Sequence, residues 1–124
     1  GICLGMQLLF GHSAEGDADL LNILDGECCA FTPADCRSVP HMGWNRIQPT
    51  TTHPLMAGLD DVSHAYFVHS YYVPVNDNTI ATCNYGEDFT AVAAKDNFFG
   101  CQFHPERSGR VGARILQNFL EIPL

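Results

Sequence analysis

The sequence predicts an α/β fold, and three stretches carry that prediction. The chain begins with G-I-C-L-G, in which a cysteine stands between two glycines, and this spacing is typical of a sharp turn from a strand into a helix. The second half is rich in β-branched and aromatic residues, which favour strands. Residues 108–122 close the chain with apolar side chains at helical spacing. Helices and strands therefore both contribute to one small domain of 124 residues.

The turn around Cys3 has the pattern of a nucleophile elbow. In such a turn the nucleophile has a strained backbone, and small residues such as Gly1 and Gly5 let the chain pass close by. The residues that follow predict the apolar part of a short helix: Met6, Leu8, Leu9 and Phe10. A helix start favours the thiolate, and the N–H of Leu4 would face an oxyanion formed when Cys3 attacks a substrate. The alternative is a buried cysteine in a glycine-flanked turn.

The rest of the first half predicts loops and short elements. Residues 27–31 form a short strand that stops before Pro33. Residues 40–45 form an ordered loop with the only tryptophan, and a short strand follows near residues 46–48. One helical turn is expected within residues 53–58.

The second half predicts strands and a final helix. A long strand covers residues 65–75, and further strands cover 79–84, 90–95 and 98–103. The last two form a hairpin with an Asp-Asn turn at residues 96–97. The closing amphipathic helix places five apolar residues on one face: Val111, Ile115, Leu116, Phe119 and Leu120.

The composition argues against two classes of partner. The net charge is −8, from 14 acidic and 6 basic side chains. Nucleic acids and anionic membrane surfaces both require clustered lysine and arginine, so neither is expected as a partner. No apolar run reaches the roughly 20 residues of a membrane-spanning helix.

The six cysteines predict free thiols rather than disulfides or metal ligands. Cys28 and Cys29 are adjacent, the others are scattered, and no Cys/His set has the spacing of a zinc site. We therefore expect no metal and no other cofactor, and a cytoplasmic location. The thiols predicted to be small buried hydrophobic groups are Cys28, Cys29, Cys36, Cys83 and Cys101.

A second cluster of chemical groups lies in F-G-C-Q-F-H-P-E, residues 99–106. His104 and Glu106 are two residues apart in extended backbone and so point the same way. A carboxylate beside an imidazole fixes its tautomer and stabilises its protonated form. Together with Cys3 these residues predict a triad of nucleophile, general acid/base and orienting carboxylate. The alternative is a surface H-x-E at the end of a strand.

The two motifs, G-I-C-L-G-M-Q and G-C-Q-F-H-P-E, resemble those of the class I glutamine amidotransferases, which use a Cys-His-Glu triad. The papain-like proteases also place Cys before His, but their C-G-S-C-W surroundings are absent. Within the amidotransferases, P-H-M-G-W-N at residues 40–45 and Y-F-V-H-S-Y-Y at 66–72 are similar to the glutaminase subunits of imidazole glycerol phosphate synthases. The resemblance extends from residue 1 to about residue 120.

This resemblance implies a flavodoxin-like α/β fold, with a mostly parallel central sheet flanked by helices and an antiparallel hairpin in the C-terminal half. Residues 1–124 are then expected to be the C-terminal portion of a single amidotransferase domain. That portion would start at the nucleophile elbow and lack the N-terminal strands and a glycine-rich oxyanion segment.

The resemblance also implies an enzyme that hydrolyses L-glutamine to glutamate and ammonia through a γ-glutamyl thioester. The ammonia would pass to a cyclase subunit, in a heterodimer that makes imidazole glycerol phosphate in histidine biosynthesis. Cys3 would be the nucleophile, His104 the general acid/base and Glu106 its orienting partner.

Further residues match binding positions of the family. Gln7 and Glu15 match positions that hold the glutamine substrate, and Ser70 and Tyr71 match positions whose backbone meets its amino-acid end. Four residues match positions on the face toward the cyclase partner: Trp44, Asn45, Tyr66 and Arg107. Lysine is usual in place of Arg107, and a planar guanidinium is not equivalent to an ammonium.

Two other functions are weighed against this one. A glutaminase for another acceptor would serve anthranilate, aminodeoxychorismate or GMP synthesis, and Trp44-Asn45 disfavours it. A truncated, non-catalytic partner-binding module is disfavoured by the intact triad. The remaining histidines are expected to be structural or surface residues: His12, His41, His53, His64 and His69.

Overall fold

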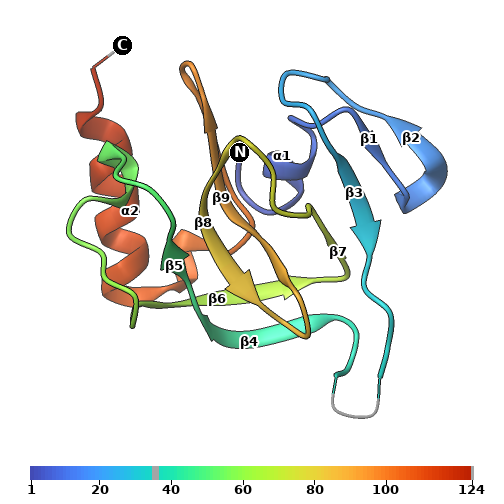
Figure 1. Ribbon diagram of the computed structural model, residues 1–124. Coiled ribbons are helices and arrows are strands. Elements are labelled where there is room, and N and C mark those ends of the chain that lie inside the picture. The colour runs from blue at the N-terminus through green and yellow to red at the C-terminus, as the bar shows by residue number, and fades with distance from the viewer. Residues whose placement is uncertain (35–36, 124) are drawn as a thin grey trace.

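The computed structural model describes residues 1–34 and 37–123 (Figure 1). The helices are α1 (Leu4–Gln7), α2 (Gly109–Glu121) and the short 3-10 turns η1 (Glu15–Asp17), η2 (Pro54–Met56) and η3 (Pro105–Arg107). The strands of the first half are β1 (His12–Ser13), β2 (Ala18–Asp19), β3 (Glu27–Ala30), β4 (His41–Arg46) and β5 (Gln48–Pro49). Those of the second half are β6 (His64–His69), β7 (Tyr71–Tyr72), β8 (Thr79–Asn84), β9 (Asp88–Lys95) and β10 (Phe98–Cys101).

The α/β class is confirmed, but the sheets are mixed where the resemblance implied a mostly parallel one. Strands β10-β9-β8-β5 form an antiparallel sheet, β4 pairs with β6, and β2-β1-β3-β7 form a third sheet. Parallel pairing joins β1 to β3, and Ile2 to Cys101. In Figure 1, α2 lies to one side of β8–β10, α1 with β1–β3 lies to the other, and β4 and β6 run below.

The first residues of the chain run beside β10. The N–H of Cys3 donates to Cys101 O at 2.8 Å, and the N–H of Cys101 donates to Gly1 O at 2.9 Å. A Cβ added to Gly100 would lie 2.9 Å from Cβ of Met6, which is fully buried. The missing side chain at residue 100 therefore lets α1 pack directly on β10.

The loop predicted for residues 40–45 is wrong, because these residues form most of β4. All six residues of β4 pair in antiparallel register with β6, from His41 opposite His69 to Arg46 opposite His64. Their side chains alternate, with His41 buried and Met42, Trp44 and Arg46 exposed, as in a strand with one solvated face.

Most other predictions of elements are confirmed: β8 has the predicted bounds, β9 begins two residues earlier, and β3, η2, β10 and α2 are shorter, whereas the strand expected near residues 46–48 is divided between the end of β4 and β5. β3, η2 and β8 occur where they are expected, and β9 and β10 form the hairpin, with Asp96 at φ 53° in its turn. The long strand predicted for residues 65–75 divides at Ser70 into β6 and β7. The chain changes partner there, because β6 pairs with β4 whereas β7 pairs with β3.

Helix α2 buries fewer apolar side chains than its stripe predicts. Its buried positions are Gly112, Ile115 and Asn118, whereas Phe119 is 50% and Leu120 81% exposed. The side-chain amide of Asn118 donates to the carbonyls of Leu55 and Ala57 at 2.9 and 2.8 Å, which fixes the helix against η2. Along the part of the chain that the structure describes, no helix is long and apolar enough to cross a membrane.

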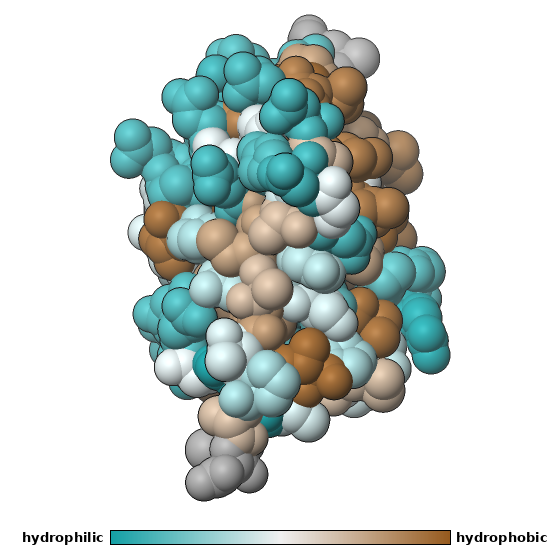
Figure 2. All heavy atoms as spheres, turned by 90° about the vertical axis from the view of Figure 1, so that its right-hand side faces the viewer, coloured by the Kyte–Doolittle hydropathy of each residue, from teal (hydrophilic) through white to brown (hydrophobic). Residues whose placement is uncertain are grey.

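The face that carries β1, β2 and β3 has two parts. Hydrophilic side chains cover its upper part, and hydrophobic side chains form a strip along one border (Figure 2). Glu15 and Asp17 of η1 are among the exposed residues of this region. The upper part of this face is therefore suited to contact with water.

Candidate active site

The backbone at Cys3 has the strain predicted for a nucleophile elbow. Its φ of 55° and ψ of −110° lie in a region that residues other than glycine rarely occupy, and α1 begins at the next residue. A Cβ added to Gly1 would overlap the carbonyl group of Gly5, so the close passage at Gly1 is confirmed. The corresponding expectation for Gly5 is wrong, because a Cβ there would meet no atom within 4 Å.

The thiol of Cys3 is not as acidic as its place before a helix suggests. Burial raises its pKa above the ordinary value, and this effect exceeds the lowering by the backbone N–H of Leu4 and the amide of Gln102. The Glu106 carboxylate also raises this pKa. Helix α1 spans only Leu4–Gln7, so its dipole cannot offset the loss of water. Removing the thiol proton therefore requires a nearby base.

His104 and Glu106 form the pair that the sequence predicts. Nδ1 of His104 lies 3.1 Å from Oε2 of Glu106, and because a carboxylate only accepts, Nδ1 carries the proton. Nε2 is then the acceptor of the neutral ring. The backbone at residue 104 is fixed by Ser108, whose buried hydroxyl donates to His104 O at 2.6 Å and accepts from the N–H of Tyr66 at 2.9 Å.

Strand β6 brings the thiol and the imidazole to the same region. Tyr66 O accepts from the N–H of His104 at 3.0 Å, and Val68 O lies 3.9 Å from Sγ of Cys3. Carbonyl groups two residues apart in a strand point the same way and are about 7 Å apart. Within the described ranges, no hydrogen bond joins Cys3 to His104; those of Sγ involve Val68 and Gln102.

The residues matched to glutamine binding differ in how many of their hydrogen-bonding groups already have a partner within the protein. The Gln7 side chain is buried, and its Nε2 donates to Tyr71 O and to Oε1 of Gln102, both at 2.9 Å. Tyr71 O also accepts from Nδ1 of His69 at 2.8 Å, so both of its lone pairs are used. Ser70 O accepts from the N–H of Phe31 at 3.0 Å, and Glu15 is exposed on η1.

Three of the residues matched to a partner face form one cluster, which we call the aromatic–arginine cluster: Trp44, Tyr66 and Arg107. Trp44 lies opposite Tyr66 in the β4–β6 register, and their ring centroids are 6.2 Å apart in an edge-to-face arrangement. The Arg107 guanidinium lies 4.6 Å above the Tyr66 ring, within the range of a cation–π contact. Trp44 is 58% exposed.

The fourth, Asn45, contacts the buried His41, which in turn contacts the buried His69. Its Nδ2 donates to Asn84 O at 2.9 Å and lies 3.1 Å from Nε2 of His41, which must therefore accept. Nδ1 of His41 then donates to Nε2 of His69 at 2.9 Å. Burial is the main reason that the pKa of each imidazole is lowered to about 4, and a neighbouring histidine adds to the effect at each ring. The structural role expected for these two histidines agrees with this arrangement.

A family model described as glutamine amidotransferase class-I matches residues 1–122. This match covers nearly the whole chain and includes the Cys3 elbow and the His104–Glu106 pair. The chain belongs to the class-I glutamine amidotransferases. The resemblance seen in its motifs is thereby confirmed.

The relatives of this class-I amidotransferase narrow the comparison. The chain is 56% identical over 123 residues to the imidazole glycerol phosphate synthase subunit HisH of Salmonella typhimurium and 55% identical to that of Escherichia coli. Each alignment covers 98% of this chain and 62% of the relative, so the chain spans 62% of the length of these relatives. A crystal structure described as a proposed GMP synthase subunit from Thermoplasma acidophilum matches with a TM-score of 0.67 and 17% identity. It is covered over 54% of its own length and 97% of this chain, and it supports the fold alone.

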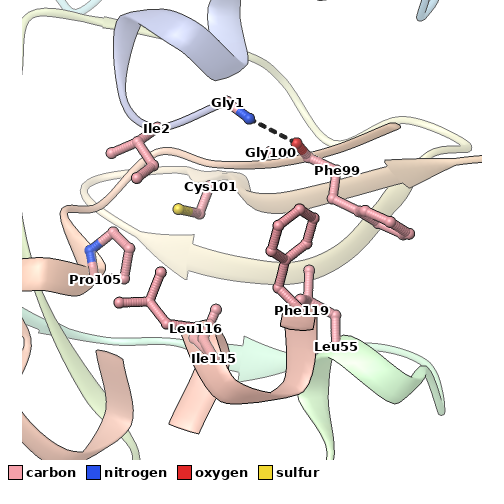
Figure 3. Close-up of a pocket in the computed structure, with 10 residues that line it drawn as sticks. All are labelled: Gly1, Ile2, Leu55, Phe99, Gly100, Cys101, Pro105, Ile115, Leu116 and Phe119. Atoms are coloured by element: carbon pink, nitrogen blue, oxygen red, sulfur yellow. Dashed lines mark hydrogen bonds between the residues drawn. The ribbon is translucent and has the colours of Figure 1, made fainter. Parts of the chain in front are cut away.

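An apolar cavity of about 150 Å³ in this amidotransferase lies between α2 and the first residues (Figure 3). Ile2, Phe99, Ile115 and Phe119 are among its walls, and among the described residues the thiol that lines it is that of Cys101. Burial raises the pKa of Cys101 to about 12, so this thiol is not a nucleophile at neutral pH. The cavity is therefore not a second candidate for a site with a cysteine nucleophile.

Burial also affects the remaining cysteines that the structure describes. Burial raises the pKa of Cys28 to about 11 and that of Cys83 to about 12, and it raises that of the half-buried Cys29 as well. The prediction for Cys36 lies outside the described residues. Among residues 1–34 and 37–123, every cysteine is a free thiol and no group of side chains could hold a metal ion.

Sequence reasoning missed three residues that position the amidotransferase motifs. Gln102 contacts the thiol, Ser108 holds the His104 backbone, and Gly112 lets α2 reach Pro105, whose carbonyl a Cβ at residue 112 would overlap. The period of two in extended backbone places Gln102 on the same side as His104, so this signal was available for Gln102. Ser108 and Gly112 depend on tertiary contacts that no local pattern reveals.

Proposed function

We propose that the protein is a glutaminase that hydrolyses L-glutamine to glutamate and ammonia, with Cys3, His104 and Glu106 as its triad. The observation that carries the proposal is the placement of Cys3 and His104 along one edge of β6, through Val68 O and Tyr66 O. The strained elbow at Cys3 and the His104–Glu106 contact support the same roles.

The first half of the reaction forms a thioester. Sγ of Cys3 attacks the side-chain carbonyl carbon of glutamine, and its proton passes to Nε2 of His104, whose Nδ1 proton Glu106 holds. The N–H of Leu4 is directed at the thiol and has no other acceptor among the described residues, so it can stabilise the oxyanion. The imidazolium returns the proton to the amide nitrogen, and ammonia leaves.

The second half releases glutamate. Water attacks the γ-glutamyl thioester while Nε2 of His104 takes one of its protons. The C–S bond breaks, the thiolate takes the proton back, and Cys3 is restored. The raised pKa of the thiol fits this scheme, because a nucleophile that stays protonated needs the base that His104 supplies.

The ammonia would be used by a cyclase subunit that makes imidazole glycerol phosphate in histidine biosynthesis, a proposal supported by the relatives named above, which are subunits of imidazole glycerol phosphate synthases. The exposed aromatic–arginine cluster lies next to the triad, since Arg107 directly follows Glu106. Gln7, Glu15, Ser70 and Tyr71 are the proposed contacts of the substrate, with Gln7 contributing through its Oε1 because its Nε2 is already used. The free thiols support a cytoplasmic location.

The test is glutamate production by the full-length protein with its cyclase partner. Cys3→Ala should abolish it, and His104→Ala should lower it roughly 100-fold or more, because a positioned general base contributes at least that factor. Glu106→Ala should cost less, since it orients rather than transfers. Cys29→Ala is the matched control, since it removes a thiol from β3 and should leave turnover unchanged. Unchanged turnover in Cys3→Ala would remove the nucleophile assignment.

A further inference from the structure

Gln102 lies between β10 and the Cys3 elbow and is completely buried. Its Nε2 lies 3.7 Å from Sγ of Cys3, within hydrogen-bonding range for sulfur, and its Oε1 lies 2.9 Å from Nε2 of Gln7. No role in the triad accounts for a buried amide at this position. Its contact with the reacting sulfur is direct.

The orientation of this amide is fixed by the groups around it. Tyr71 O can only accept, so the atom of Gln7 that contacts it must be the nitrogen Nε2. That same nitrogen contacts Gln102, which must therefore present its oxygen to Gln7. The Gln102 nitrogen is left facing Cys3. The thiol thus meets a donor and not an acceptor, and reversing the amide would place two donors together.

We propose that Gln102 is a further catalytic residue, whose side-chain amide donates a hydrogen bond to the Cys3 sulfur and stabilises the thiolate. The catalytic part of this proposal rests on the proposed function. A donor to sulfur favours the anion during attack, and it favours the same anion again when the thiolate leaves the γ-glutamyl thioester. Both halves of the reaction pass through a negatively charged sulfur, so one fixed donor assists both.

The surroundings of the thiol show why such a donor matters. Burial disfavours the thiolate, and the carboxylate of Glu106 adds to this effect. The thiol of Cys101 is the other titratable group coupled to Cys3 on the β10 side, and His104 is the base in the adjacent segment. Only the N–H of Leu4 and the amide of Gln102 lower the pKa of Cys3. Removing Gln102 takes away one of these two donors.

The experiment measures the pH at which chloroacetamide alkylates Cys3 at half its maximal rate, with the modified peptide identified by mass spectrometry. Gln102→Glu replaces the donor with a carboxylate, and its midpoint should rise by about one pH unit or more. Gln102→Met keeps the length without a donor and should raise the midpoint less. Gln117→Glu makes the same chemical change on the exposed face of α2 and should leave it unchanged. Equal midpoints in all four folded proteins would overturn the proposal.

A second measurement needs no substitution at residue 102. In the unmutated protein, the side-chain amide resonances of Gln102 should shift with pH at the midpoint found by alkylation of Cys3. The shift should disappear in Cys3→Ala. Gln102 amide chemical shifts that do not change over the pH range in which Cys3 titrates would also overturn the proposal. Neither measurement requires turnover, so a failure of the glutaminase function would appear in the glutamate assay alone.

Discussion

At the scale of single residues, two buried imidazoles show how strongly hydrogen bonds specify charge. Asn45 Nδ2 donates to His41, His41 donates to His69, and His69 donates to Tyr71 O. The sequence of donors and acceptors is complete only when both rings are neutral, because a protonated His41 would place two donors opposite each other at Asn45. Tyr85 stacks on His41 with 4.1 Å between ring centroids, and His104 is the neighbouring titratable group that lowers the pKa of His69.

This chain of hydrogen bonds predicts a loss of stability in acid. The pKa of each ring is about 4 in the folded state against an ordinary value of 6.5, so between these values the unfolded chain binds more protons. The contribution of these two neutral rings to the free energy of unfolding should therefore be complete above pH 6.5, and it should decrease as the pH drops toward 4. Each extra proton contributes a slope of about 1.4 kcal/mol per pH unit.

Urea unfolding over this pH range measures the slope. The glutamine of His41→Gln cannot gain a proton. The dependence of the free energy of unfolding on pH should therefore be weaker in this variant, by the contribution of about one proton. An identical slope in the variant and the unmutated protein would show that His41 does not resist protonation.

At the scale of elements, the segment that carries His104 of the proposed triad is held between β6 and α2. The N–H of His104 donates to Tyr66 O of β6, and Ser108 connects the same strand to the carbonyl of His104. On the other side, Gly112 of α2 lies against the backbone of Pro105. Ser108 and Gly112 are both buried, so the contacts that hold this segment are shielded from water. The position of the imidazole therefore depends on how closely α2 approaches η3.

A methyl group at residue 112 should displace His104 of the proposed triad without contacting it. The Cβ of Gly112→Ala would overlap Pro105 O, which forces α2 away from η3. Overpacking of this kind costs about 1–3 kcal/mol of stability. A displacement of about 1 Å at the imidazole can lower the rate by roughly 100-fold.

Glutamate production and urea unfolding of the full-length protein check both effects. Ala113→Ser adds one atom at the adjacent exposed position of the same helix and serves as the control. Wild-type turnover in a folded Gly112→Ala protein would show that the approach of α2 does not position His104.

At the scale of the whole molecule, the proposed triad and the aromatic–arginine cluster, in which Trp44 is exposed and Tyr66 half-buried, lie close together. Trp44 and Tyr66 lie on facing strands β4 and β6, and Arg107 joins them from η3, directly after the triad. Met42 is 62% exposed on the same side of β4 as Trp44. Exposed aromatic and arginine side chains are enriched in protein interfaces. A partner seated on this cluster would meet the segment that holds His104 and Glu106.

This arrangement predicts that Trp44→Ala weakens the effect of the partner more than the basal reaction. In the full-length protein, glutaminase rates with and without the cyclase subunit should differ less in the variant than in the unmutated protein. Leu21→Ala removes a side chain that is also highly exposed, at 65%, but lies on the β2 side, and is the control. If Trp44→Ala lowers both rates by the same factor, Trp44 contributes to folding and not to the partner surface.

How far the sequence predicts this molecule depends on the range of the interactions involved. The elbow, the β9–β10 hairpin and the His104–Glu106 contact follow from short local spacing, and the structure confirms their geometry. β4 was predicted as a loop because its strand character comes from pairing with β6, a strand distant in the sequence. The sequence indicated only the helix start, which favours the thiolate of Cys3, and not the burial that raises its pKa, because burial depends on the whole fold.

At Cys3, the backbone conformation and the thiol require different residues. Conformations of this kind cost roughly 1–3 kcal/mol for any residue with a side chain, and glycine alone adopts them freely. Only glycine would relieve the strain at φ 55°, and glycine has no thiol. Selection for thermal stability alone would therefore favour loss of the thiol at this position. If Cys3 has the proposed role, the fold gives up stability at this position in exchange for a reactive thiol.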